Sequence, residues 1–143
     1  MPRICTRAFT LVAAALLGAG TGSASLAMPP GDLAPVELSA PAGANAAAID
    51  QHGLWHRAAI SQQGSANDAG ILQRGSGHDA RIDQQGSGNE ARILQFGWRP
   101  QQAAIHQLGD INSARVEQQA GTRTGVAIEQ RGDGLAVEVT VGR

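Results

Sequence analysis

An eleven-residue repeat runs through the sequence after residue 44 and constrains the fold more than any other feature. It is clearest over residues 67–97, which read NDAGILQRGSG, HDARIDQQGSG and NEARILQFG. A central apolar residue marks each unit and recurs at steps of eleven or twelve residues. The marks are Ile49, Ile60, Ile71, Ile82, Ile93, Ile105, Val116, Ile128 and Val139.

Other residue types keep a fixed distance from this mark. Alanine precedes it by two residues in most units, glutamine follows it by two, and glycine follows it by four. Odd-numbered units open with asparagine, and the ninth unit breaks the glutamine column. The glutamines are Gln51, Gln62, Gln73, Gln84, Gln95, Gln107, Gln118 and Gln130; the glycines are Gly53, Gly64, Gly75, Gly86, Gly97, Gly109 and Gly132; the asparagines are Asn45, Asn67, Asn89 and Asn112.

The spacing within a unit predicts a β-strand. Alanine, the apolar mark and glutamine are two residues apart, so they share one face of a strand. An eleven-residue period also fits a helical supercoil. However, seven of the nine units carry this glycine, and glycine costs about 1 kcal/mol in a helix interior. Glycine and asparagine instead suit the positive φ angles of tight turns. Each unit is therefore expected to be one short strand and one turn.

The turn residues make the structural repeat a pair of units. Odd units open with asparagine, whereas the second and fourth open with His56 and His78. Stacked pairs predict an all-β parallel β-solenoid (cross-β) of about 4.5 two-strand coils, with two facing sheets roughly 10 Å apart and coils roughly 4.8 Å apart. A buried glutamine amide is costly unless it is bonded. We therefore expect the glutamines to form ladders along the stack.

These columns resemble the curlin repeat over residues 45–143, with departures at Pro100, Ala120 and the final unit. The resemblance implies a secreted subunit of curli, the functional amyloid fibres of bacterial surfaces. The segments that carry it are Gln62-x-Gly64-x-x-Asn67-x-Ala69-x-x-x-Gln73 and Gln84-x-Gly86-x-x-Asn89-x-Ala91-x-x-x-Gln95. The tail, Ala127-Ile128-Glu129-Gln130-Arg131 followed by Ala136-Val137-Glu138-Val139-Thr140-Val141, is most similar to the minor, nucleating subunit.

The residues before the repeats predict export. Residues 1–27 read as a secretory signal peptide, with Arg3 and Arg7 ahead of an apolar run and small residues before the expected cleavage after Ala27. Residues 28–44 hold four of the six prolines and are expected to form a disordered leader. The family resemblance implies that the outer-membrane curli export pore reads this leader; a plain linker is the alternative.

Several functional classes find no support in the composition. A net charge of −1 lacks the basic field of nucleic-acid binding proteins. The only cysteine, Cys5, lies in the predicted signal peptide, and no nucleophile elbow or phosphate-binding loop is present, so we expect no catalytic residue and no cofactor. His56 and His78 would lie one coil apart, but no third ligand is evident, and no metal site is predicted.

The resemblance implies a structural role through assembly. Its partners would be the major curlin subunit, further copies of itself, the export pore and accessory factors at the outer membrane, and its location an extracellular fibre on the cell surface. The last unit, with Val137, Val139 and Val141 inward, is the expected attachment strand. The alternatives are a major polymerising subunit and a non-amyloid β-solenoid adhesin or binding module.

Overall fold

The computed structural model describes residues 9–17, 22–24, 43–119 and 124–142, and every element among them is a β-strand. None of these residues forms a helix long and apolar enough to cross a membrane. The strands are β1 (Phe9–Leu17), β2 (Gly22–Ala24), β3 (Asn45–Leu54), β4 (Arg57–Ser65), β5 (Asp68–Ser76), β6 (Asp79–Ser87), β7 (Glu90–Gly97), β8 (Gln102–Leu108), β9 (Ser113–Gln119), β10 (Gly125–Arg131) and β11 (Ala136–Val141).

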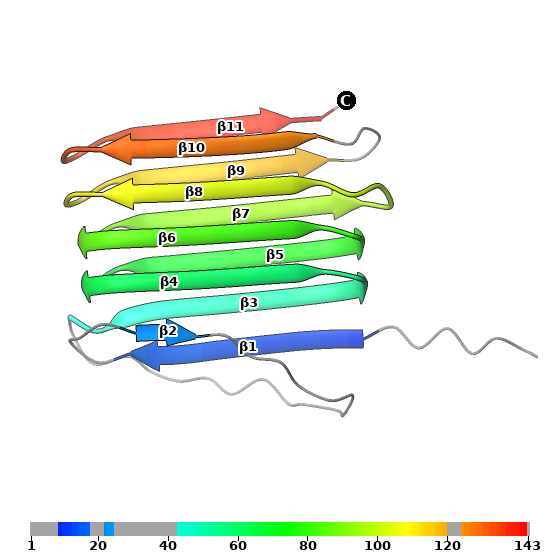
Figure 1. Ribbon diagram of the computed structural model, residues 1–143, viewed down its shortest axis with the longest axis horizontal. Coiled ribbons are helices and arrows are strands. Elements are labelled where there is room, and N and C mark those ends of the chain that lie inside the picture. Colours follow the sequence, from blue (N-terminus) through cyan, green and yellow to red (C-terminus); the bar gives the residue numbers. More distant parts are fainter. Residues whose placement is uncertain (1–8, 18–21, 25–42, 120–123, 143) are drawn as a thin grey trace, which may run out of the picture.

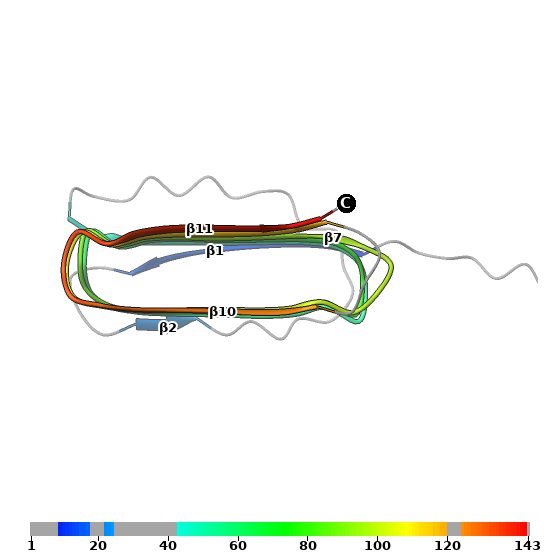
Figure 2. The same ribbon diagram turned by 90° about the horizontal axis from the view of Figure 1, so that it is seen from above.

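The nine strands from β3 to β11 wind into a solenoid of two facing sheets (Figures 1 and 2). Odd-numbered strands form one sheet in the order β3-β5-β7-β9-β11, and even-numbered strands form the other in the order β4-β6-β8-β10. Within each sheet the neighbours are parallel and in register with the repeat, as in the pairing of Ile49 with Ile71 and of Gln51 with Gln73. This confirms the predicted parallel β-solenoid.

Two further strands cover the N-terminal end of the solenoid. β1 pairs with β3 antiparallel, from Phe9 opposite Gly53 to Leu17 opposite Asn45. β2 pairs with β4 antiparallel over three residues. Both strands belong to residues 1–27, for which the signal peptide stays a prediction. Apart from residues 43 and 44, the expected leader lies outside the described residues.

The alanine and isoleucine columns form the core between the sheets. The marks from Ile60 to Ile128 are all buried, and Ile82 in the middle of the stack has no exposed surface. Burial of a side chain of this size stabilises a fold by roughly 1.5–3 kcal/mol. Ile49 on β3 and Val139 on β11 are half-buried; β3 has the antiparallel β1 on one side, and β11 is the last strand of its sheet. The core is therefore best packed in the central coils.

The repeat glycines close the turns. All seven have φ angles between 112° and 145°, which L side chains rarely adopt. Close stacking gives a second reason for glycine. A Cβ atom at Gly75 would overlap the carbonyl oxygen of Gly97 in the next coil, and one at Gly64 would overlap that of Gly86. The turn positions of Gly64 and Gly75 thus admit no side chain.

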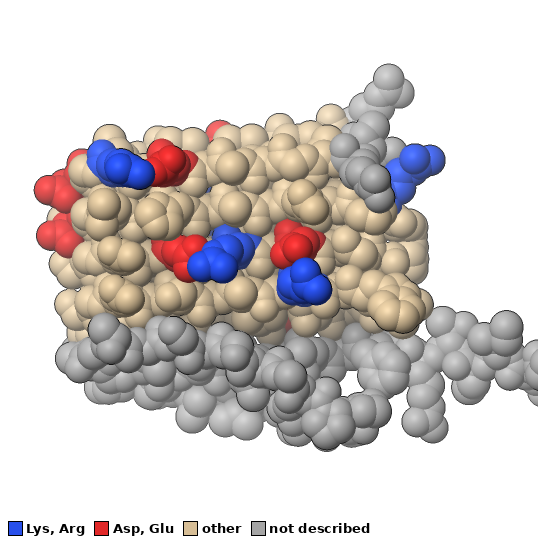
Figure 3. Space-filling view, viewed as in Figure 1, with Lys and Arg blue, Asp and Glu red and all other residues tan. Residues whose placement is uncertain are grey.

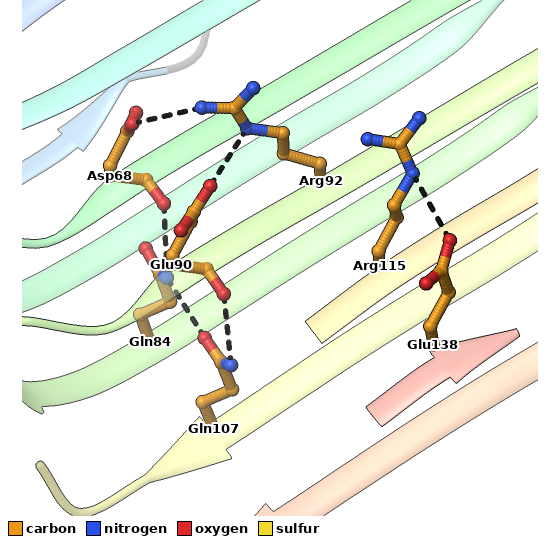
Figure 4. Close-up of polar contacts among 7 residues, drawn as sticks. All are labelled: Asp68, Gln84, Glu90, Arg92, Gln107, Arg115 and Glu138. Atoms are coloured by element: carbon orange, nitrogen blue, oxygen red, sulfur yellow. Dashed lines mark hydrogen bonds and ion pairs between the residues drawn. The ribbon is translucent and has the colours of Figure 1, made fainter. Parts of the chain in front are cut away.

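The face of the molecule drawn in Figure 3 carries interspersed charges of both signs. Arg92 lies 3.1 Å from Glu90 on the same strand and 3.6 Å from Asp68 on the next. Arg115 in β9 lies 3.6 Å from Glu138 in β11 and so links the last two strands of that sheet (Figure 4). Exposed pairs of this kind contribute little to stability. They keep the outer surface hydrated.

Candidate functional site: the side-chain ladders and the solenoid ends

Two ladders of glutamine amides run along the inside of the solenoid. The odd-unit ladder has Nε2–Oε1 distances of 2.7, 2.9 and 2.8 Å from Gln51 to Gln118. The even-unit ladder has distances of 2.9, 2.9 and 2.8 Å from Gln62 to Gln130. All members except Gln51 are buried. The structure thus brings together the glutamines that the sequence had singled out.

The ladder amides from Gln62 to Gln130 also tie the two sheets together. One N–H of each donates to a backbone carbonyl at the start of a strand in the opposite sheet (Figure 4). Gln84 donates to the Asp68 carbonyl at 3.2 Å, and Gln107 donates to the Glu90 carbonyl at 3.1 Å. Because one amide serves both the ladder and the sheet-to-sheet contact, the buried polar group is almost fully satisfied.

The ladders have a direction. In every step, Nε2 of the earlier coil donates to Oε1 of the later coil. At the N-terminal end this leaves the Oε1 atoms of Gln51 and Gln62 without a ladder donor. The Gln62 Oε1 atom is buried and has no hydrogen-bond partner within the described ranges. A buried acceptor without a partner costs about 1–3 kcal/mol.

The buried asparagines form a third ladder, which runs in the opposite direction. The Oδ1 atom of each asparagine accepts the backbone N–H of the equivalent residue in the next coil, at 3.0 Å each time. The Nδ2 group donates to the carbonyl of a turn glycine, for example from Asn45 to Gly64 at 3.0 Å and from Asn112 to Gly132 at 2.7 Å. Leu135 takes the asparagine position in the ninth unit and ends the ladder.

Histidines occupy the corresponding column of the second and fourth units. The rings of His56 and His78 are stacked, with centroids 5.0 Å apart. The backbone N–H of His78 donates to Nδ1 of His56 at 3.3 Å, which assigns the proton of His56 to Nε2, 3.1 Å from the His52 carbonyl. Burial lowers the pKa of both histidines, and each ring is therefore neutral at pH 7.

The histidine column continues into a residue that the sequence reasoning missed. Gln101 opens the sixth unit and is buried, with Nε2 3.3 Å from the Phe96 carbonyl. The inserted residue before it, next to Pro100, shifts the eleven-residue spacing, so that Gln101 does not stand out in the sequence. The available signal was its spacing: Gln101 lies four residues before Ile105, as His78 lies four residues before Ile82. No group of three or more histidine, cysteine or acidic side chains that could hold a metal occurs in the described part of the chain.

The C-terminal end of the solenoid differs from the N-terminal end. Val141 lies beside Gln118 in the register of β11, where a glutamine would continue the odd ladder. Gln118 instead directs Nε2 to the Thr124 carbonyl at 3.3 Å and to its hydroxyl at 3.5 Å. Val137 is 40 % exposed, although it lies on the inward face, because the opposite sheet ends one strand earlier. This end thus presents valines on one sheet and Gln130 on the other.

The comparisons with known proteins agree with this architecture. Residues 44–75 and 64–97 match a family model described as the curlin-associated repeat. No curated protein and no solved structure matches the chain. The matched residues contain the first five units, in which the glutamine and asparagine columns are unbroken. The repeat matches show that residues 44–97 are similar to curlin-associated repeats, and the parallel solenoid continues the same column pattern through the later units.

Proposed function

We propose that this chain is the minor subunit of a curli-type amyloid fibre, which nucleates polymerisation of the major curlin and anchors the fibre to the cell surface. The observation that carries the proposal is the set of ladders. They bond each coil to the next along the axis, and they stop at the ninth unit, where Val141 and Leu135 replace glutamine and asparagine. The chain thus has one end built for stacking and one end of different chemistry.

Nucleation in this proposal is templating. The end of a solenoid offers a strand edge with unpaired N–H and C=O groups. It also offers core side chains and ladder amides already fixed in the register that an incoming curlin repeat needs. Holding these groups in place removes part of the conformational entropy cost of forming the first coil. No catalytic group is required for growth.

The ninth unit is the proposed attachment strand. Val137, Val139 and Val141 form a row of β-branched residues with high strand propensity. The row has no strand facing it across the gap between the sheets, since β10 is the last strand of the other sheet. An accessory protein at the outer membrane is the proposed partner. The alternative is that β11 only caps the core, as terminal repeats of solenoids do.

Export precedes these steps in the proposed function. Residues 1–27 are the proposed signal peptide and residues 28–44 the proposed leader for the outer-membrane pore. Support comes from the sequence: a basic start, an apolar run and small residues before the expected cleavage, followed by a proline-rich segment.

The major polymerising subunit is the closest rival and shares the same repeats. A binding module of the ice-binder or adhesin type is less well supported. Such a module presents a flat array of like residues. One outward column of the odd-strand sheet instead reads Asp50, Leu72, Leu94, Glu117 and Thr140.

Deletion of Leu135–Arg143 tests the proposal. We expect the truncated chain to seed a major curlin in thioflavin assays but to leave the cell surface for the medium, because the attachment strand is gone. Substituting the exposed Glu138 by Gln is the matched control, since it keeps the valine row, and it should stay on the cell. A truncated chain that remains cell-bound but no longer seeds would show that this end is the template instead.

A further inference from the structure

The N-terminal face of the solenoid presents two open glutamine acceptors. They are the Oε1 atoms of Gln51 on β3 and Gln62 on β4, one in each sheet, because the ladder donors always come from the earlier coil. The Gln62 acceptor is buried and unpartnered in the residues that the structure describes. A chain that stacks here as the preceding coil must therefore bring an Nε2 donor to both sheets.

The C-terminal face of this chain brings only one such donor. Gln130 on β10 donates one amide hydrogen to the Ser113 carbonyl at 3.1 Å, and its Oε1 atom accepts from Gln107 at 2.8 Å. By the direction of the earlier ladder steps, its second amide hydrogen is the one left for a following coil. On β11 the ladder position is Val141, which has no donor. The last amide below it, Gln118, is already bonded to Thr124.

Two parallel registers could stack one copy on another, and neither satisfies Gln62. With β10 beside β3 and β11 beside β4, Gln130 reaches Gln51, but Val141 lies opposite Gln62. With β11 beside β3, no strand lies beside β4, because the solenoid has an odd number of repeat strands, β3 to β11. The second register also sets Asn45 against Leu135, which has no side-chain acceptor.

We infer that the N-terminal face selects a different chain over a second copy: a curlin-repeat subunit whose last two units both end their strands with a ladder glutamine. This inference rests on the proposed function and adds the partner specificity of its growth face. A buried acceptor is satisfied in the mixed junction and orphaned in the self-junction. The chain is consequently a poor homopolymer and an effective first coil for another subunit.

The precursor has this face covered. β1 pairs with β3 over nine residues, and β2 pairs with Ile60, Ser61 and Gln62 of β4. Both covering strands are antiparallel and lie within the predicted signal peptide. Removal of residues 1–27 would therefore uncover both strand edges of the selective face at once.

The test restores the missing donor. Val141→Gln and wild type are expressed as full chains in cells that export curlins but make none of their own, so that residues 1–27 are processed naturally. Thr140→Gln is the matched control, because it adds the same amide at the neighbouring, outward position. The lag time of homopolymerisation is measured by thioflavin fluorescence, and fibre length by electron microscopy. Seeding of a major curlin is measured in parallel.

Val141→Gln is expected to shorten the homopolymerisation lag several-fold and to lengthen the fibres, whereas Thr140→Gln behaves as wild type. All three proteins should seed the major curlin equally, since the N-terminal face is unchanged. Equal lag times for wild type and Val141→Gln would overturn the inference, as would an equal gain from Thr140→Gln. Loss of seeding by Val141→Gln alone would also overturn it by placing growth at the other end. If none of the proteins seeds a major curlin, the proposed function itself fails.

Discussion

At the scale of single residues, a charged side chain on the inward face of a central strand is expected to destabilise the fold. Ile82 lies at the centre of the stack with no exposed surface. Ile82→Asp places a carboxylate among apolar side chains, and an uncompensated buried charge destabilises a fold by about 3–5 kcal/mol. We expect thioflavin-positive assembly to be lost. Ala104→Asp on the outward face beside Arg81 is the control. Normal assembly of Ile82→Asp would show that the inward face is misassigned.

The glutamine ladder gives a second residue-scale prediction. Gln84→Ala removes the acceptor for Gln62 and the donor for Gln107, so two buried amides lose a partner. The expected loss is about 1–3 kcal/mol of unfolding free energy. Gln63→Ala, which removes an exposed outward amide, should cost less than about 0.5 kcal/mol. Denaturant unfolding of both variants checks this, and equal losses would argue against the ladder as a source of stability.

At the scale of the turn, glycine is required by both conformation and stacking. Gly75 has a φ of 128°, and an added Cβ would overlap the Gly97 carbonyl. Gly75→Ala should destabilise the solenoid by about 1–3 kcal/mol or more. Gly70→Ala is the matched control, because its Cβ would meet only Arg92 Cγ at 4.0 Å, an ordinary contact. The thermal midpoints of the two variants distinguish them, and equal midpoints would contradict the stacking argument.

The histidine column makes one turn edge sensitive to acid. Burial lowers the pKa of His56 and His78 below 6.5, so below that pH the unfolded chain binds more protons than the folded chain. Stability is therefore complete above pH 6.5 and falls as the pH drops. His78→Gln should weaken this dependence, since Gln101 shows that glutamine fits the column. Melting curves between pH 5 and 8 test this; an unchanged pH dependence in the variant would exclude the histidines as its source.

Elements that repeat could be predicted from the sequence, because one column pattern fixes the strand, its register and its inward face together. Ile71 and Gln73 each occupy the predicted place between equivalent residues of the neighbouring coils. Features outside the period could not be predicted. The one-residue insertion before Gln101 interrupts the eleven-residue spacing. The pairing of β1 with β3 could not be predicted either, because residues 1–27 do not contain the repeat. The hydrogen bond from Asn45 to the Gly64 carbonyl is a further example, because it joins the asparagine column of one sheet to the glycine column of the other.

At the scale of the whole molecule, stability should vary along the solenoid axis. A stack of coils is held by contacts between neighbours, so interior coils have two partners and terminal coils have one. The marks on β5 to β9 are at most 3 % exposed, whereas Ile49 and Val139 on the first and last repeat strands of the odd sheet are only half-buried. Amide exchange of the chain alone should therefore be slowest in β6 to β8 and faster in β4 and β11.

Polymerisation with a major curlin should change this gradient at one end only. If the partner stacks on the N-terminal face, the backbone N–H and C=O groups of β3 and β4 gain ladder partners, and their amides should exchange as slowly as those of β6. The amides of β11 should exchange at the rate of the free chain, because no coil follows the valine strand. Hydrogen exchange read by mass spectrometry on isolated fibre seeds makes this comparison within one sample. Protection gained by β11 and absent from β3 would reverse the direction of growth.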